Sequence, residues 1–264
     1  MTLYRFLPLA LLLLSGVGCS SHYEMQDLED EGSVFERLAH REKRDEKFSQ
    51  AADSFAKAGA KYLPAHAIAV ERENGVFKRH LRLKLATVFA GEAHCRRPDK
   101  DTTSGDWKKS KELFLEATSW AIDGGFIRME RDMLVGQAEC LRPDNNPQGS
   151  WEEAGKLYAK AVALSREIRD DEGIGATLSA HAICLLEGPT LEKLNDKIRK
   201  LLIEASKLGN KSAAELLSQT GARFCFACSN EIKGDVRFCP KCGHDQVQKP
   251  KVVTAPGPRE PPPE

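Results

Sequence analysis

Apolar residues recur through most of the chain at the three- and four-residue spacing of an amphipathic helix. In the segment from Trp151 to Ala161 they stand at intervals of three or four, which places them on one helical face. Alanine and leucine dominate the composition and runs of β-branched residues are few, which also favours helix. We therefore expect an all-α body over residues 33–220.

The helical pattern repeats with an offset of 44 residues, because the run from Trp107 to Ala117 returns as the run from Trp151 to Ala161. The preceding segment repeats too, since Gly-x-Ala-x-Cys-x-Arg-Pro-Asp occurs at 91–99 and at 136–144. The match continues into residues 198–208, and a fainter copy begins at Phe48. Each unit predicts a pair of helices.

Several residues mark where these helices begin and end. Ser150 with Glu153 forms a capping-box start, and Asp106 can cap the helix that begins at Trp107. The preceding helices are expected to end before the prolines at 98, 143 and 189. These signals divide the body into helix pairs joined by loops.

The spacing of Trp151, Ala154, Tyr158 and Ala161 resembles the second helix of the tetratricopeptide and Sel1-like family, and the stretch 205–217 resembles a Sel1-type junction. The resemblance covers about residues 45–220, with a period longer than the family's roughly 34 residues. It implies a helical-hairpin solenoid whose concave face binds peptides or partner domains. A plain helical bundle, and an array that serves only as a spacer, are the alternatives.

Two Cys-x-x-Cys pairs, each preceded by Arg-Phe, predict a metal site near the end of the chain. Zn²⁺ takes four thiolates at tetrahedral corners, and two such pairs supply them. We expect one structural zinc ion per chain, with the ligands Cys225, Cys228, Cys239 and Cys242.

Residues 222–245 resemble the small β zinc-ribbon domains of bacterial proteins, through the run from Phe238 to Gly243. The first pair departs from that family at Ala227 and Ser229. Two local disulfides, or a redox dithiol, remain the alternative to zinc. The basic residues of this segment are expected to offset the charge of the thiolates, so nucleic acid is not expected as a partner.

The first 18 residues resemble an export signal, with Arg5 ahead of an apolar run too short to span a membrane. Cys19 follows, as in a bacterial lipoprotein signal, although Gly16 stands where that signal has leucine. The resemblance implies lipidation of Cys19, a tether over residues 19–32 and attachment to the cell envelope as an outer-membrane lipoprotein. Simple secretion to the periplasm is the alternative.

The composition limits which partners and which further features can be expected. The 39 basic residues balance the 39 acidic ones, so no overall field favours nucleic acid. Residues 246–264 are proline-rich and predict a disordered tail. Three further cysteines, at repeat-equivalent positions, are expected to be buried free thiols, namely Cys95, Cys140 and Cys184.

No catalytic motif is recognised, so the sequence predicts a non-enzymatic scaffold for protein–protein interaction, attached to the cell envelope and carrying a structural zinc ribbon. The alternatives are a zinc-ribbon regulator that contacts nucleic acid, and a thiol–disulfide protein that uses the paired cysteines.

Overall fold

The computed structural model describes residues 7–100, 105–187, 195–219, 223–224, 231–232 and 238–243. The predicted tail at 246–264, two of the four predicted zinc ligands (Cys225 and Cys228) and Pro189 lie outside these ranges. Nine helices occur in the described part: α1 Leu7–Arg44, α2 Phe48–Glu71, α3 Gly75–Cys95, α4 Trp107–Gly124, α5 Ile127–Leu141, α6 Trp151–Glu167, α7 Asp171–Glu187, α8 Asn195–Lys207 and α9 Lys211–Gln219.

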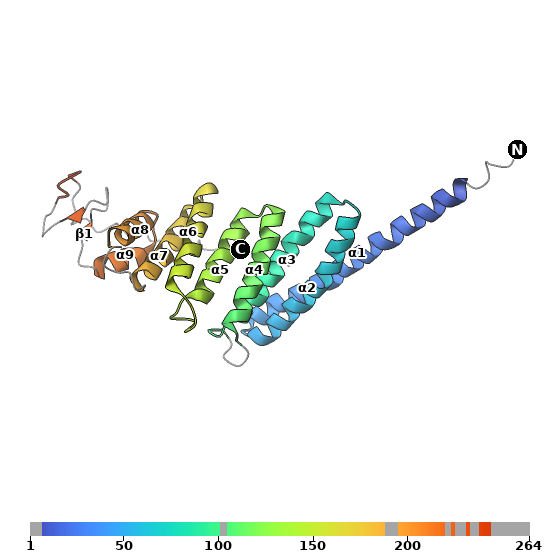
Figure 1. Cartoon of the computed structure of the whole chain (residues 1–264), viewed down its shortest axis with the longest axis horizontal. Coiled ribbons are helices and arrows are strands. Elements are labelled where there is room, and N and C mark those ends of the chain that lie inside the picture. Colours follow the sequence, from blue (N-terminus) through green and yellow to red (C-terminus); the bar gives the residue numbers. More distant parts are fainter. Residues whose placement is uncertain are drawn as a thin grey trace, which may run out of the picture.

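Each helix packs against its neighbours in the chain, so the helices form a consecutive array of hairpins (Figure 1). The core runs along this array as successive clusters, in which the aromatic rings of Phe55, Phe114 and Tyr158 are fully buried. The predicted all-α body is confirmed, and the array is compatible with a tetratricopeptide-like repeat. The stacking supplies the burial that one hairpin alone lacks.

The short turns of the array share one backbone geometry. In the turn from α2 to α3, the N–H of Asn74 donates to the carbonyl of Ala69 and that of Glu73 donates to Val70. This is the Schellman arrangement, which needs a left-handed residue at its centre. The same bonds recur in four more turns, and the left-handed residues have φ between 54° and 84° at Glu46, Glu73, Gly125, Arg169 and Gly209.

The longer loops between α3 and α4, and between α5 and α6, follow the repeated Arg-Pro-Asp motif. Arg97 donates to both carboxylate oxygens of Asp99, at 2.9 and 3.0 Å, and its guanidinium lies 5.4 Å from the centre of the Trp107 ring. The equivalent contacts are made in the second loop by Arg142, Asp144 and Trp151. The predicted caps also form, since Asp106 accepts from two N–H groups of α4 and Ser150 accepts from Glu153.

Close packing within helix pairs depends on single glycines. A Cβ atom added at Gly136 on α5 would lie 2.6 Å from the Phe114 ring of α4. Gly91 on α3 stands in the same relation to the Phe55 ring of α2. The aromatic ring therefore rests directly on the backbone of the next helix.

The N-terminal segment departs from the predicted tether over residues 19–32. Helix α1 runs through this segment, Met25 is fully buried, and a side chain at Gly32 would meet the ring of Tyr62 on α2. Leu28 also packs against this cluster. At least residues 25–32 belong to the helical array, because an apolar face among the acidic residues here is covered by α2.

A short hairpin follows the array. Strand β1 (Arg223–Phe224) pairs with β2 (Glu231–Ile232) in antiparallel register, with Arg223 opposite Ile232. These strands lie in the segment for which a zinc ribbon is predicted. The ribbon as a whole stays a prediction, since most of it falls outside the described residues.

Candidate binding groove

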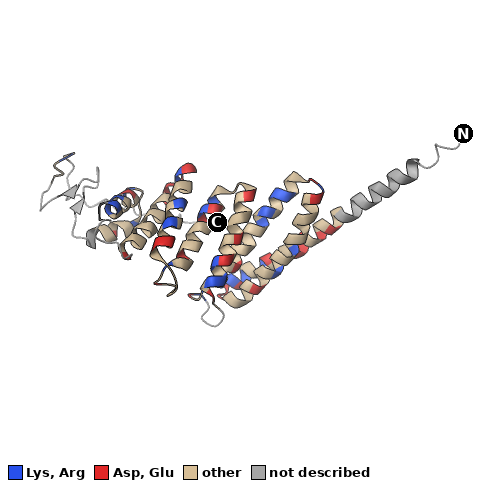
Figure 2. Cartoon of the chain, viewed as in Figure 1, with Lys and Arg blue, Asp and Glu red and all other residues tan. Residues whose placement is uncertain are grey.

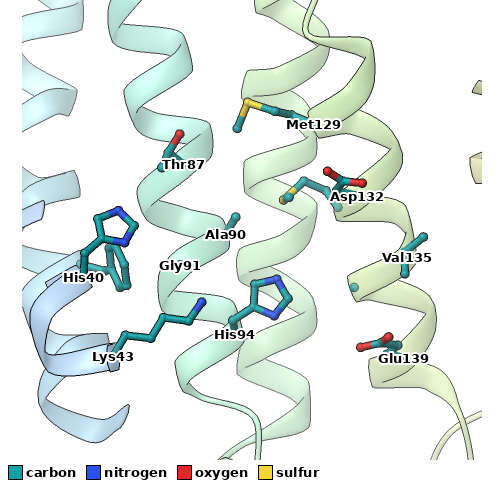
Figure 3. Close-up of a pocket in the computed structure, with 13 residues that line it drawn as sticks. His40, Lys43, Thr87, Ala90, Gly91, His94, Met129, Asp132, Val135 and Glu139 are labelled. Atoms are coloured by element: carbon teal, nitrogen blue, oxygen red, sulfur yellow. The ribbon is translucent and has the colours of Figure 1, made fainter. Parts of the chain in front are cut away.

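A hollow of about 480 Å³ opens between α1, α3 and α5 (Figure 3). Its floor includes the small residues Ala90 and Gly91 on α3 and Gly136 on α5. Gly91 and Gly136 are small for the packing reason given above, because the rings of Phe55 and Phe114 lie where their Cβ atoms would stand. The hollow is thus a consequence of how the pairs pack.

A second hollow, of about 410 Å³, lies between α5 and α7. Asp132, Val135 and Glu139 line both hollows, so the two hollows adjoin at α5. We call the resulting surface the odd-helix groove. It is lined by α1, α3, α5 and α7, with the ring of Phe55 as the contribution of an even helix.

Carboxylates dominate the part of the groove between α5 and α7. Arg131 donates to Asp132 and to Asp170. The N–H of Gly173 and the guanidinium of Arg131 both donate to the Asp170 carboxylate and hold its pKa below the usual range. Glu139 accepts from the guanidinium of Arg97. Glu172 lies exposed at the start of α7 and also lines the groove. Four carboxylates thus accompany the single guanidinium among the lining residues.

The opposite end of the groove, between α1 and α3, carries a cation and two imidazoles. Lys43 extends from α1 toward His94 on α3, and His40 lies one turn before it (Figure 3). Lys43 makes no ion pair within the described part of the chain. His94 packs edge-on against Phe114 at 4.9 Å, and burial lowers its pKa to about 4, so this ring is neutral at pH 7.

The predicted zinc ligands are described only in their second pair. Cys239 is buried and Cys242 is exposed, and the N–H of Gly243 donates to the carbonyl of Cys239 at 2.8 Å. Gly243 has φ +72°, the conformation for which a glycine is needed after a Cys-x-x-Cys turn. Within the residues that the structure describes, no three metal-ligating side chains come together. The zinc site stays a prediction.

The three repeat-equivalent cysteines are free and buried, as expected. Burial raises the pKa of Cys95 and Cys140 to about 11 and that of Cys184 to about 12. Thiols that keep their proton at neutral pH are poor nucleophiles and poor metal ligands. These side chains therefore act as small apolar groups in the core.

Cys19, the predicted lipidation site, lies on the backbone of α1, and its side chain is not among those described. Within the described part of the chain, no helix combines the length and the apolar character needed to cross a bilayer. Lipidation stays a prediction.

Comparison of the chain with protein-family models, with curated proteins and with solved structures finds no match.

The sequence predicts binding on a concave face but identifies no residue there. The repeat is visible in the sequence because core positions recur, whereas the groove is lined by different residues on each helix, such as Thr87, Asp132 and Ala176. One signal was available, since Gly91 and Gly136 recur in the aligned motif. Both glycines lie on the helix face that lines the groove.

Proposed function

We propose that this protein is a non-enzymatic scaffold that binds a protein partner along the odd-helix groove. The observation that carries the proposal is that the two hollows adjoin at α5, where three residues line both. A single pocket of this size would suit a small molecule, but a groove that crosses successive helices suits a chain of residues.

The shape and the charges of the groove support a polypeptide rather than a polyanion. Positive and negative residues are mixed along the array (Figure 2), and the groove between α5 and α7 carries an excess of carboxylates. Such a surface repels phosphate backbones, which bind to clustered Lys and Arg. A rigid array also lowers the cost of binding, because its surface is ordered before the partner arrives.

Two further parts of the proposal concern the ends of the chain. We place the protein at the bacterial cell envelope through a lipid on Cys19, and we assign one structural zinc ion to Cys225, Cys228, Cys239 and Cys242. Membrane association of the expressed chain, and its loss on Cys19→Ser, tests the lipid; an unprocessed N-terminal peptide beginning at Met1 would contradict it.

Site-specific photo-crosslinking in the bacterial host tests the groove. A benzophenone amino acid is placed at Thr87 on α3 or at Ala176 on α7, both of which line the groove. Ala163, exposed on α6 and outside the groove, is the matched control. We expect the same partner, identified by mass spectrometry, to be linked at both groove positions.

The controls distinguish specific binding in the groove from non-specific crosslinking to the protein surface. Adducts that form equally at Ala163, or that contain unrelated proteins at Thr87 and Ala176, would contradict a shared binding groove. Each variant is compared with the unmodified protein by circular dichroism, so that loss of adducts is not confused with loss of folding.

A further inference from the structure

The hollow of about 480 Å³ between α1, α3 and α5 differs from the rest of the odd-helix groove in its lining. Beside a few polar groups it offers a phenyl ring, two thioethers and aliphatic groups, supplied by Phe55, Met129, Met133, Val135 and Ala90. Pockets of roughly 300–1,000 Å³ with an apolar lining and a small number of placed polar groups are the usual sites of small molecules. By size and lining, this hollow belongs to that class.

Lys43 is a charged group of this lining that has no counter-ion within the described part of the chain. Its side chain is half-buried and extends from α1 toward His94 on α3 (Figure 3). Burial lowers the pKa of His94 and the charge of Lys43 lowers it further, which agrees with an ammonium group close to that ring. Because a cation partly removed from water is unfavourable without a partner, the hollow favours an anion at this place.

The two carboxylates of the lining limit the charge of that anion. Asp132 accepts from Arg131 at 2.7 Å, and Glu139 accepts from Arg97, so both already have a cation. They stand on α5, across the hollow from Lys43 (Figure 3). Against a single ammonium group they repel a dianion more strongly than a monoanion. The charges of the hollow therefore favour a ligand with one negative charge.

His94 supplies a second donor beside the ammonium group. Its ring is neutral at pH 7, so one of its nitrogens carries a proton and can donate to an anion. Neither ring nitrogen has a hydrogen-bond partner among the described residues, and neither is an orphaned atom sealed from solvent. The edge-on contact with Phe114, at 4.9 Å between ring centres, holds the ring in place. One charged and one neutral donor match the two oxygens of a carboxylate.

We propose that the hollow between α1, α3 and α5 binds a small monocarboxylic acid with an apolar body. Lys43 and His94 hold the carboxylate, and the apolar body lies against the ring of Phe55 and the thioethers of Met129 and Met133. The inference goes beyond the proposed function, because the ligand is a small molecule and needs this one hollow alone.

Methyl NMR of the full chain tests the proposal, with hexanoate as the probe. The chain has four methionines, of which Met129 and Met133 line the hollow, whereas Met25 lies in the core cluster that joins α1 to α2. With ¹³C-methyl methionine in the protein, we expect the signals of Met129 and Met133 to shift and to saturate as hexanoate is added, while that of Met25 stays in place. No shift at Met129 and Met133, or an equal shift at Met25, would overturn the proposal.

Two further probes separate the charge of the ligand from its apolar body. 1-Hexanol has the body without the charge, and inorganic phosphate has charge without the body. Each should bind at least about tenfold more weakly than hexanoate, because each lacks one of the two matched features. Equal affinity for 1-hexanol would overturn the role of the two donors, and equal affinity for phosphate would overturn the assignment to a monocarboxylic acid.

Variants test the place of binding. Lys43→Gln should weaken hexanoate binding at least about tenfold, whereas Lys43→Arg, which keeps the charge, should retain most of it. Lys160 is the matched control because it is an exposed lysine of α6 outside the hollow, so Lys160→Gln should leave the affinity unchanged. His94→Phe keeps a ring against Phe114 but removes the second donor, and should weaken binding several-fold. An unchanged Met25 signal shows that each variant is folded, and equal effects of Lys43→Gln and Lys160→Gln would place the ligand elsewhere.

The result is separable from the proposed function. If hexanoate fails to bind while Thr87 and Ala176 still crosslink to one partner, the groove stands and its small-molecule site does not. If hexanoate binds and no partner is linked at either position, the opposite holds.

Discussion

The contact between Gly136 and the ring of Phe114 limits how closely α4 and α5 approach. Both residues are fully or almost fully buried, and the ring lies where a Cβ atom would stand. The same contact between Gly91 and Phe55 shows that the arrangement belongs to the repeat. These glycines align in the repeated sequence, but the sequence alone does not give the reason for them, because a glycine within a helix also occurs without any such contact.

We therefore predict that Gly136→Ala destabilises the protein by about 1–3 kcal/mol, since the new methyl group has to displace a buried ring. Urea unfolding followed by circular dichroism measures the change. The matched control is Gly59→Ala, where the nearest atom to an added Cβ is 3.6 Å away on Val88. There the higher helix propensity of alanine should leave stability unchanged or raise it by up to about 1 kcal/mol. Equal effects at the two positions would contradict the packing argument.

His181 on α7 gives a residue-scale prediction for pH. Burial, with a smaller contribution from Lys197, lowers the pKa of His181 to about 4 from the ordinary 6.5. The unfolded chain therefore takes up this proton before the folded chain does. The contribution of neutral His181 to the free energy of unfolding is fully present above pH 6.5 and is lost as the pH falls toward 4. The loss is at most about 3 kcal/mol.

Unfolding at pH 7.5 and at pH 5 measures this loss, and His181→Leu should reduce the difference between the two values. The exposed His22 provides the control, since His22→Leu should leave the difference as it is in the unaltered protein. A pH dependence unchanged by His181→Leu would show that other groups cause it.

At the scale of the element, the left-handed turn residues are the least expected feature. Gly125 stands in a Gly-Gly pair that predicts a helix end, and the structure confirms it. Glu46, Glu73 and Arg169 adopt the same conformation without being glycine. The residue type does not predict this conformation, because Glu and Arg do not favour positive φ. The packing of the two flanking helices fixes the backbone of the turn, and the residue at its centre adopts the left-handed conformation whatever its side chain.

This mismatch predicts a stabilising substitution. Glu73→Gly should raise the free energy of unfolding by about 1 kcal/mol, because a left-handed residue with a Cβ atom costs roughly 1–2 kcal/mol and the entropy of glycine in the unfolded chain offsets part of the gain. Glu71→Gly, two residues earlier and still within α2, should instead lower it by up to about 1 kcal/mol. Thermal unfolding of the pair checks both signs, and a loss of stability at both positions would exclude the turn as the source of strain.

The cysteine pairs belong to a second element, for which the sequence remains the main evidence. Gly243 and the bond from its N–H to Cys239 are as expected for a Cys-x-x-Cys turn. We predict one zinc ion per purified chain, and loss of most of that zinc in Cys239→Ser, because three thiolates hold zinc less tightly than four. Cys95→Ala, which removes a buried free thiol, should keep the metal. Full zinc content in Cys239→Ser, or disulfides in place of metal, would contradict the site.

At the scale of the whole molecule, much of the array could be predicted and the groove could not. Core positions such as Phe114 and Tyr158 recur in the sequence at the 44-residue offset, so the helix pairs and their order are visible there. The groove exists only after α1, α3, α5 and α7 are placed in the array, and apart from Gly91 and Gly136 its lining residues do not recur in the aligned motif. The prediction of a tether over residues 19–32 does not hold at Met25, which is buried in the core of the array. The reason is related, because the burial of Met25 depends on packing against α2, which the local sequence does not reveal.

Packing between successive helices has a consequence for how the molecule loses structure. In such an array each unit is stabilised by its immediate neighbours, so a defect should act mainly on the units beside it. We predict that Leu202→Ala, in the fully buried core of α8, increases hydrogen exchange in α7–α9 and leaves α2 and α3 protected. Leu85→Ala, an equally buried leucine on α3, should have the opposite distribution. Each removes about 2–5 kcal/mol of packing locally. An equal loss of protection from α1 to α9 in both variants would contradict this prediction, because it would show that the array unfolds as one cooperative unit.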